Sequence, residues 1–308
     1  MSNAIEVRGL SKVYGEKRAL DGMNLDVPSG SVFGFLGPNG AGKTTTLRIL
    51  TGLASPTAGE ARVFGRDVNR ATNEVRADIG VLPDVPGFYE WMTGPELLRF
   101  VGRLFGGGGP ALERRVQALI DLAGLSGVTS RIGGYSRGMR QRLGVAQALI
   151  NAPKLLMLDE PTSALDPIGR KEVLDMIASL GGRTTVFFST HILSDVERVC
   201  DHVAILQGGR VVIQATVGEL TSRHGDSRIL MEVTGPPGPL ADEIRSQPWA
   251  TEVGCEESGT LSVKVDDLAA ARVAIPAAMA RLGLGLVRFE TGERSLEEVF
   301  VDLAGGEE

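Results

Sequence analysis

The most specific chemical pattern in the sequence is a glycine-rich run that ends in lysine and threonine, directly after the apolar stretch VFGFL. It fits G-x-x-x-x-G-K-[ST] and consists of Gly37, Pro38, Asn39, Gly40, Ala41, Gly42, Lys43 and Thr44. Glycines let backbone N–H groups curl around phosphate oxygens, and the start of a helix adds partial positive charge. We therefore predict that this run, with the next residue Thr45, binds the phosphates of a nucleotide, and that Lys43 neutralises the terminal phosphates.

Two adjacent acids offer the second half of a nucleotide-hydrolysing site. They are Asp159 and Glu160 in the stretch KLLMLDEP, after four apolar residues that predict a buried strand. We expect Asp159 to hold Mg²⁺ through water, beside Thr44, whose hydroxyl is placed to hold the same ion. Glu160 is then positioned to accept a proton from an attacking water. The two motifs together predict a site that hydrolyses a nucleotide.

With these motifs in this order, residues 4–220 resemble the nucleotide-binding subunits of ABC transporters. The resemblance implies that Tyr14, in KVYG, stacks on adenine, and that His191, after TTVFFST, senses the γ-phosphate in catalysis. It implies that the SALD segment at 163–166 touches a partner subunit, with Asp166 close to the ATP of that opposite subunit. ATP and Mg²⁺ are the implied cofactors. The implied fold is α/β, a P-loop NTPase of the ABC type.

The family signature, commonly L-S-G-G-Q, departs from its usual form here and reads YSRGMRQR. Ser136 and Gly138 are kept, and the resemblance implies that they meet the ATP bound to the opposite subunit. Arg137 and Met139 stand where glycine and glutamine are usual. Arg137 could add charge toward the phosphates or lie in solvent.

A second departure is Asp84, which stands between two prolines where most family members carry glutamine. A carboxylate is a better ligand for a hard cation than an amide, but it is one methylene shorter and cannot donate a hydrogen bond to water. We expect Asp84 to be a Mg²⁺ ligand that leaves the enzyme active with an altered metal dependence. The alternative is an aspartate that caps the next turn.

The elements that position these residues are strands alternating with helices from Ile5 to about Leu220. Runs such as SVFGFLG, KLLMLDEP and TTVFFST predict a largely parallel sheet with helices on both faces. The opening stretches AIEVRGLSKVY and GMNLDVPSGSVFGFLG predict an antiparallel β subdomain beside that sheet. Between Asp84 and Pro153 the pattern turns helical, which predicts an inserted helical subdomain at about 85–152, with a flexible break at the four glycines 106–109.

The C-terminal part predicts a separate accessory domain. A linker, TSRHGDS, separates an ATP-binding domain at 1–220 from residues 221–308, which follow the pattern strand, helix, strand, helix, strand and a final helix, RSLEEVFVDLAG. This predicts a small α+β domain with 8 basic and 16 acidic residues, whereas the remainder of the chain is near neutral. Because non-specific nucleic-acid binding needs a basic surface, no nucleic-acid partner is expected.

Composition bounds the location of the chain. It has 308 residues, 43% of them hydrophobic, and no apolar stretch approaches the length of a membrane-spanning helix. The N-terminus lacks the apolar centre of a secretory signal, which predicts a cytoplasmic protein. Its two cysteines, Cys200 and Cys255, fit no zinc spacing and are interpreted as free thiols. His202 and His224 are interpreted as surface residues.

The resemblance implies an ATPase that works as a homodimer and powers export through a separate integral-membrane permease, which would hold it peripherally at the inner face of the cell membrane. The stretch GFYEWMTGPELL offers a contact surface in Phe88, Tyr89, Trp91 and Met92, or else these residues form the core of the helical subdomain. The alternatives are a soluble ABC-type ATPase acting on ribosomes or DNA, and an ATP-binding regulator without a transport role. The transported substrate, the permease and the role of the C-terminal domain are open.

Overall fold

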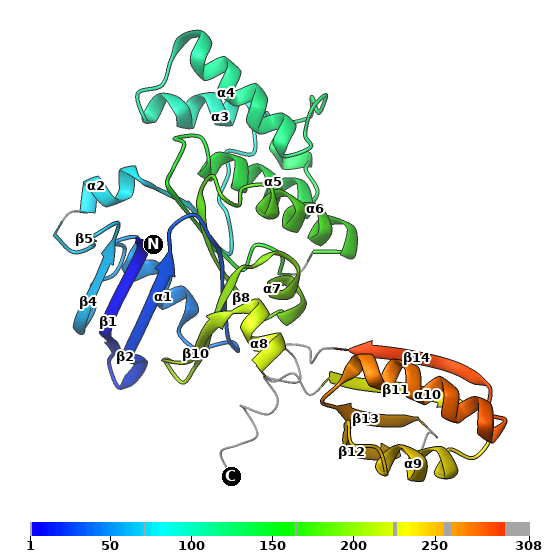
Figure 1. Cartoon of the computed structure of the whole chain (residues 1–308). Coiled ribbons are helices and arrows are strands. Elements are labelled where there is room, and N and C mark those ends of the chain that lie inside the picture. The colour runs from blue at the N-terminus through cyan, green and yellow to red at the C-terminus, as the bar shows by residue number, and fades with distance from the viewer. Residues whose placement is uncertain (1, 71, 164, 224–226, 256–259, 293–308) are drawn as a thin grey trace. The chain divides into compact units, whose positions relative to one another are not determined.

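The computed structural model in Figure 1 describes residues 2–70, 72–163, 165–223, 227–255 and 260–292. The chain divides into two compact units, Met1–Val217 and Gly218–Glu308. The predicted final helix RSLEEVFVDLAG, the histidine at position 224 and the alanine of SALD lie outside the described residues.

The first unit is built around a six-stranded sheet in the order β10-β9-β3-β8-β7-β6. Five of its strands are parallel and β10 is antiparallel to β9. The strands are β3 (Val32–Leu36), β6 (Ile79–Leu82), β7 (Leu155–Asp159), β8 (Thr185–Thr190), β9 (His202–Gln207) and β10 (Arg210–Thr216). Every residue of β3, β7 and β8 is buried, as expected of central strands covered on both faces. The predicted parallel sheet is confirmed.

A second, antiparallel sheet of order β2-β1-β4-β5 covers one face of the central sheet. Its strands are β1 (Asn3–Tyr14), β2 (Lys17–Pro28), β4 (Ala58–Val63) and β5 (Arg66–Asp67), and the helices α1 (Lys43–Leu50) and α2 (Thr72–Ala77) belong to the same part of the chain. Val7 and Leu25 from this sheet share one apolar core with Phe35 and Met157 of the central strands. Burial of this shared core fixes the position of the loop between β3 and α1.

Helices inserted between β6 and β7 form the top of the unit in Figure 1. They are α3 (Gly94–Leu104), α4 (Gly109–Leu122), the short η1 (Ile132–Gly134) and α5 (Arg137–Ala148). Thr93 and Glu96 cap α3 reciprocally. The break at the glycines is shorter than expected, because α4 begins at the fourth of them. The helices that follow later in the chain are α6 (Pro167–Ala178) after β7, α7 (Leu193–Val199) after β8 and α8 (Val217–Arg223) after β10.

The second unit contains a four-stranded antiparallel sheet of order β12-β13-β11-β14 and two helices. The elements are β11 (Ser227–Val233), α9 (Gly238–Arg245), β12 (Ala250–Cys255), β13 (Leu261–Val265), α10 (Leu268–Leu282) and β14 (Leu286–Gly292). This βαββαβ order is that of the ferredoxin-like split βαβ motif. Sequence analysis missed β12, whose exposed residues carry no alternating apolar pattern. The second unit has an apolar core of its own, which includes Trp249 and Ile275.

Across the residues that the structure describes, no helix is long and apolar enough to span a membrane. The prediction that His202 is a surface residue is wrong. It is the first residue of β9, only partly exposed, and its ring lies parallel to that of Phe33, with 6.3 Å between the ring centroids.

Candidate active site

The glycine-rich run forms the loop between β3 and α1, and its shape requires glycine at two positions. Gly42 has φ +115°, and a Cβ there would lie 2.7 Å from the carbonyl oxygen of Ala19. A Cβ on Gly37 would lie 2.5 Å from the carbonyl oxygen of Leu206. Gly42 is also the N-cap of α1, and no side chain caps this helix end. The first N–H groups of α1 are therefore available to phosphate oxygens.

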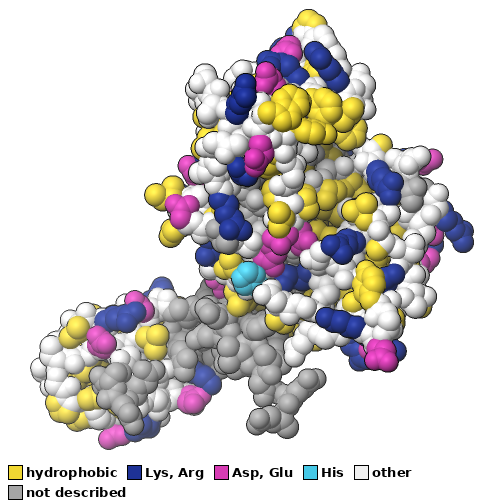
Figure 2. All heavy atoms as spheres, turned by 180° about the vertical axis from the view of Figure 1, so that it is seen from behind, with side chains coloured by type: hydrophobic (Ala, Val, Ile, Leu, Met, Phe, Trp, Pro, Cys, Tyr) yellow, Lys and Arg dark blue, Asp and Glu magenta, His cyan; other side chains and the backbone are white. Residues whose placement is uncertain are grey.

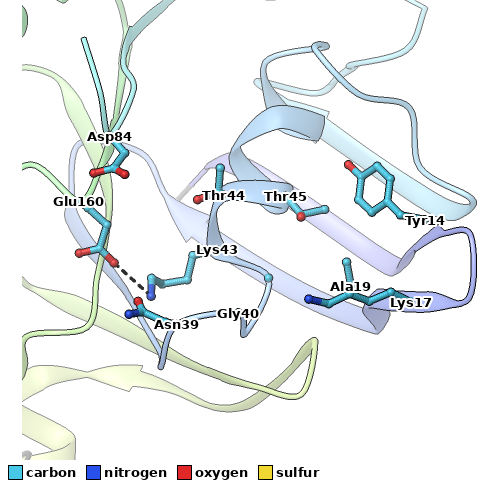
Figure 3. Close-up of a pocket in the computed structure, with 11 residues that line it drawn as sticks. Tyr14, Lys17, Ala19, Asn39, Gly40, Lys43, Thr44, Thr45, Asp84 and Glu160 are labelled. Atoms are coloured by element: carbon cyan, nitrogen blue, oxygen red, sulfur yellow. Dashed lines mark ion pairs between the residues drawn. The ribbon is translucent and has the colours of Figure 1, made fainter.

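The side chain of Lys43 contacts this loop and points its ammonium group toward Glu160. Its Nζ donates to the carbonyl oxygen of Gly37 at 2.6 Å and to that of Pro38 at 3.2 Å. It also forms an ion pair with Oε1 of Glu160 at 3.1 Å, drawn as the dashed line in Figure 3. Only 6% of the Lys43 side chain and 12% of the Glu160 side chain are exposed. Water screens this pair far less than a surface pair.

Glu160 is held at both carboxylate oxygens, because Oε2 lies 2.9 Å from Nδ1 of His191. His191 follows the last residue of β8, and Glu160 follows the last residue of the neighbouring strand β7. The backbone of Glu160 is in the left-handed region, with φ +49°. A non-glycine residue adopts that conformation only where its surroundings impose it, which makes Glu160 a precisely placed group.

Asp159 is fixed from the strand beside it. Its Oδ1 accepts a hydrogen bond of 2.5 Å from the hydroxyl of Ser189, a fully buried residue of β8. The same hydroxyl oxygen accepts from the N–H of Glu160 at 3.2 Å. Ser189 therefore orients both acids, and the sequence analysis missed it. Its place in TTVFFST, two residues before His191, was the only signal.

Lys43 and Glu160 line a cavity of about 300 Å³. Its lining consists of Tyr14, Lys17, Ala19, Asn39, Gly40, Gly42, Lys43, Thr44, Thr45, Asp84 and Glu160. Figure 3 shows Tyr14 at one end and Glu160 at the other, with the loop and Thr45 between them. Tyr14 is half exposed, and Nζ of Lys12 lies 4.8 Å from its ring centroid. Lys17 and Ala19, which sequence analysis missed, belong to β2, the strand that follows Tyr14.

Asp84 lies two residues beyond β6 and reaches the same cavity. With Thr44 and Asp159 it also lines an adjoining cavity of about 410 Å³. One hydroxyl and two carboxylates are a donor set that suits Mg²⁺, which is commonly held by one or two carboxylates together with substrate phosphates. Within the described parts of the chain, no three acidic, histidine or cysteine side chains form a metal site by themselves. Asp84 also accepts a hydrogen bond of 3.4 Å from the hydroxyl of Ser163.

Seven predicted site residues do not line these cavities: Gly37, Pro38, Ala41, His191, Ser136, Gly138 and Asp166. The last three were predicted to meet the ATP of an opposite subunit. Ser136 caps α5 and its Oγ accepts from the N–H of Met139 at 3.2 Å. Gly138 is in the first turn of the same helix, and Asp166 caps α6 by accepting from the N–H of Gly169 at 3.2 Å. Ser136, Gly138 and Asp166 therefore lie at the starts of two helices that contact each other.

Comparison with known proteins places these features in a family. A family model described as ABC transporter matches residues 20–163. The chain is 39% identical to the daunorubicin/doxorubicin resistance ATP-binding protein DrrA of Streptomyces peucetius, over 99% of this chain and 93% of that protein. It is 36% identical to the Nod factor export ATP-binding protein I of Cupriavidus metallidurans, over 100% and 99%. A solved structure of an ATP-binding subunit of an ABC transporter is 30% identical, with a TM-score of 0.63, over 72% of this chain and 93% of that one.

Proposed function

Because this chain belongs to the ABC transporter ATP-binding proteins, we propose that its ATP hydrolysis powers export of a substrate through a separate membrane permease. The chain is an ATPase of the ABC type. The observation that supports the hydrolytic role best is the placement of Glu160, whose two carboxylate oxygens face Lys43 and His191 at one end of the nucleotide cavity.

Different residues of the site bind the adenine, bind the phosphates and accept the proton during hydrolysis. Tyr14 stacks on adenine, while the loop from Gly37 and the N-terminus of α1, including Thr45, hold the phosphates. Glu160 accepts a proton from the attacking water as the water oxygen bonds to the γ-phosphorus, and the bond from that phosphorus to its bridging oxygen breaks. The products are ADP and inorganic phosphate. His191 keeps the Glu160 carboxylate turned to the γ-phosphate.

Thr44, Asp159 and Asp84 are the residues that would hold Mg²⁺. When bound, the ion neutralises charge on the β- and γ-phosphate oxygens. Ser189 fixes the orientation of Asp159 through its short hydrogen bond. The Asp84 carboxylate is free to approach the ion if it exchanges its long 3.4 Å bond to Ser163 for that contact.

The working form in this proposal is a homodimer with two ATP sites. Ser136, Gly138 and Asp166 lie at helix starts outside the cavity of their own chain, as groups that meet the ATP of a second copy would. The N-terminus of α5 contributes partial positive charge toward the phosphates there.

The permease is proposed to dock beside Asp84, holding the chain at the inner face of the cell membrane. The stretch after Asp84 divides its large side chains: Phe88 and Met92 pack against the core of the helical part, whereas Tyr89 and Trp91 are 49% and 63% exposed. Val85 is exposed as well. Figure 2 shows hydrophobic side chains gathered on the surface of this unit. Isolated exposed apolar residues are common, but a cluster of them is typical of an interaction surface.

Two experiments test the proposal. The first measures Mg²⁺-dependent ATP hydrolysis against protein concentration, beside Glu160→Gln. We expect turnover that rises faster than linearly with concentration in the wild type and is lost in the variant. A turnover per chain that does not depend on concentration would contradict the homodimer.

The second experiment captures the tagged chain from detergent-solubilised membranes of its own cell. We expect recovery of a polytopic membrane protein. Recovery of ribosomes or DNA in its place would contradict the transport role and favour an ABC-type ATPase with a different task.

A further inference from the structure

We propose that Asp195 is a positioning residue for ATP hydrolysis, which places the segment from Glu160 to α6 through a buried hydrogen-bond network. This inference rests on the proposed function of Glu160. Of the charged side chains in the described ranges, only Asp195 has no exposed surface at all. Burying a carboxylate costs free energy unless its oxygens are paired. The partners of Asp195 therefore indicate which segments it holds in place.

Both oxygens of Asp195 have partners on other elements. Oδ2 accepts a 2.5 Å hydrogen bond from the hydroxyl of Thr162, which is only 1% exposed. Oδ1 accepts a 2.6 Å charge-assisted bond from Nε of Arg170. Arg170 in turn donates from Nη2 to the hydroxyl of Ser194 at 2.7 Å. Charge-assisted bonds of this kind are stronger than neutral ones.

The sequence positions of these partners show that the network joins segments next to the two proposed catalytic residues. Thr162 is the second residue after Glu160, and Asp195 is the fourth residue after His191. Arg170 lies in the first turns of α6. Asp195 therefore fixes Thr162 at one end and Arg170 at the other end of the segment 163–169, and it does so from the helix that follows His191.

Glu160 needs such support because of its backbone. Its φ of +49° is unfavourable for a residue with a Cβ, and such a conformation persists where neighbouring contacts impose it. Upstream, its N–H is held by the carbonyl oxygen and hydroxyl of Ser189. Downstream, Thr162 provides a side-chain anchor to Asp195. Without the hydrogen bond from Thr162 to Asp195, the carboxylate of Glu160 would lose part of its alignment with Lys43 and His191. Small displacements of a catalytic base lower the reaction rate strongly.

A residue that only stabilised the fold would behave differently from a positioning residue. Its loss would lower the melting temperature and leave the turnover of the remaining folded protein unchanged. Loss of positioning lowers kcat while the KM for ATP changes little, because the phosphate loop and Tyr14 are untouched.

The test uses two substitutions at Thr162 in the full-length chain. Thr162→Val keeps the shape and removes the hydroxyl, whereas Thr162→Ser keeps the hydroxyl. Asp195→Asn probes the network from its other side, keeping the shape of the side chain and removing its charge. The matched control is Arg198→Gln on the same helix, which removes a surface ion pair with Asp175 and leaves the network intact. Steady-state ATP hydrolysis is measured well below the melting temperature of every variant.

We expect kcat to fall about tenfold or more in Thr162→Val and Asp195→Asn, with KM for ATP within about threefold of the wild type. Thr162→Ser should recover most of the turnover, and Arg198→Gln should match the wild type. An unchanged kcat in Thr162→Val, or an equal loss in Thr162→Ser, would overturn the positioning role alone. A wild-type chain that does not hydrolyse ATP in the same assay would overturn the proposed function and this inference together.

Discussion

Nδ1 of His191 lies 2.9 Å from Oε2 of Glu160, across the ends of two neighbouring parallel strands. The other carboxylate oxygen, Oε1, lies 3.1 Å from Nζ of Lys43. Each oxygen of the proposed base thus faces a different nitrogen, one from the residue after β8 and one from the first residue of α1. Besides Lys43, His191 is therefore the contact that fixes the orientation of the Glu160 carboxylate.

His191→Ala should therefore lower kcat about 100-fold while changing the KM for ATP by less than about threefold. The reason is that the imidazole orients the base, whereas ATP is held by the loop and Tyr14. Steady-state ATP hydrolysis measures both constants. The control is Glu113→Gln, which removes a surface pair with Arg99. A kcat close to that of the wild type would show that Lys43 alone orients Glu160.

Asp84→Gln should keep hydrolysis but raise the Mg²⁺ concentration needed for half-maximal activity about tenfold, because an amide is a poorer ligand for a hard cation. Titration of Mg²⁺ against ATP hydrolysis measures this. Ser163→Ala removes only the 3.4 Å hydrogen bond to Asp84 and should leave that midpoint in place. If both variants shift the midpoint equally, Asp84 acts through Ser163 and not as a ligand.

Gly42→Ala should abolish nucleotide binding. It combines φ +115° with a Cβ only 2.7 Å from both the carbonyl oxygen of Ala19 and Cδ2 of Leu20, so the loop must move. Gly40→Ala, at φ +83° with open space around the Cβ, carries only backbone strain of about 1–2 kcal/mol and should weaken binding less. Titration with a fluorescent ATP analogue and thermal unfolding compare the two. Equal losses would mean that strain, not the clash, dominates.

The parts of the site that sequence analysis predicted are those encoded locally. The run from Gly37 to Thr44 contains the glycines of the turn, the start of α1 and the cationic side chain of Lys43. Asp159 and Glu160 come directly after the four apolar residues of β7. The central sheet was predictable for the same reason, since strands buried on both faces are continuous apolar runs.

The parts that escaped prediction depend on contacts between distant segments. The bonds from Thr162 to Asp195 and from Ser189 to Asp159 join residues 33 and 30 positions apart, and no local pattern encodes them. Strand β12 lies at a sheet edge with most residues exposed, so it lacks a period of two. The split between partly buried Phe88 and exposed Trp91 arises in a stretch without regular structure, where periodicity gives no guidance.

The two thiols should differ in reactivity. Burial, with the nearby charges of Asp201 and Asp195, raises the pKa of the Cys200 thiol well above its usual value. Because the thiolate is the reactive form, Cys200 stays protonated and unreactive as the pH rises past the range where an ordinary cysteine ionises. Iodoacetamide at pH 8 should therefore label the exposed Cys255 at least about tenfold faster in the native chain, and both at similar rates in urea. Equal native rates, measured by mass spectrometry, would contradict the raised pKa of the Cys200 thiol.

Trp91→Ser should separate permease binding from hydrolysis. Trp91 is 63% exposed and its ring centroid lies 6.0 Å from that of Tyr89, so the substitution removes apolar surface without opening the core. Buried aromatic side chains dominate the affinity of many interfaces, and loss of one commonly costs more than about 2 kcal/mol, or roughly 30-fold. The isolated chain should keep its ATP hydrolysis, whereas recovery of the membrane protein in the capture experiment should fall by that order. Val273→Ser, at an exposed apolar position of α10 in the second unit, is the matched control. If Val273→Ser abolishes capture and Trp91→Ser does not, the permease binds the accessory unit and the proposed docking surface is wrong.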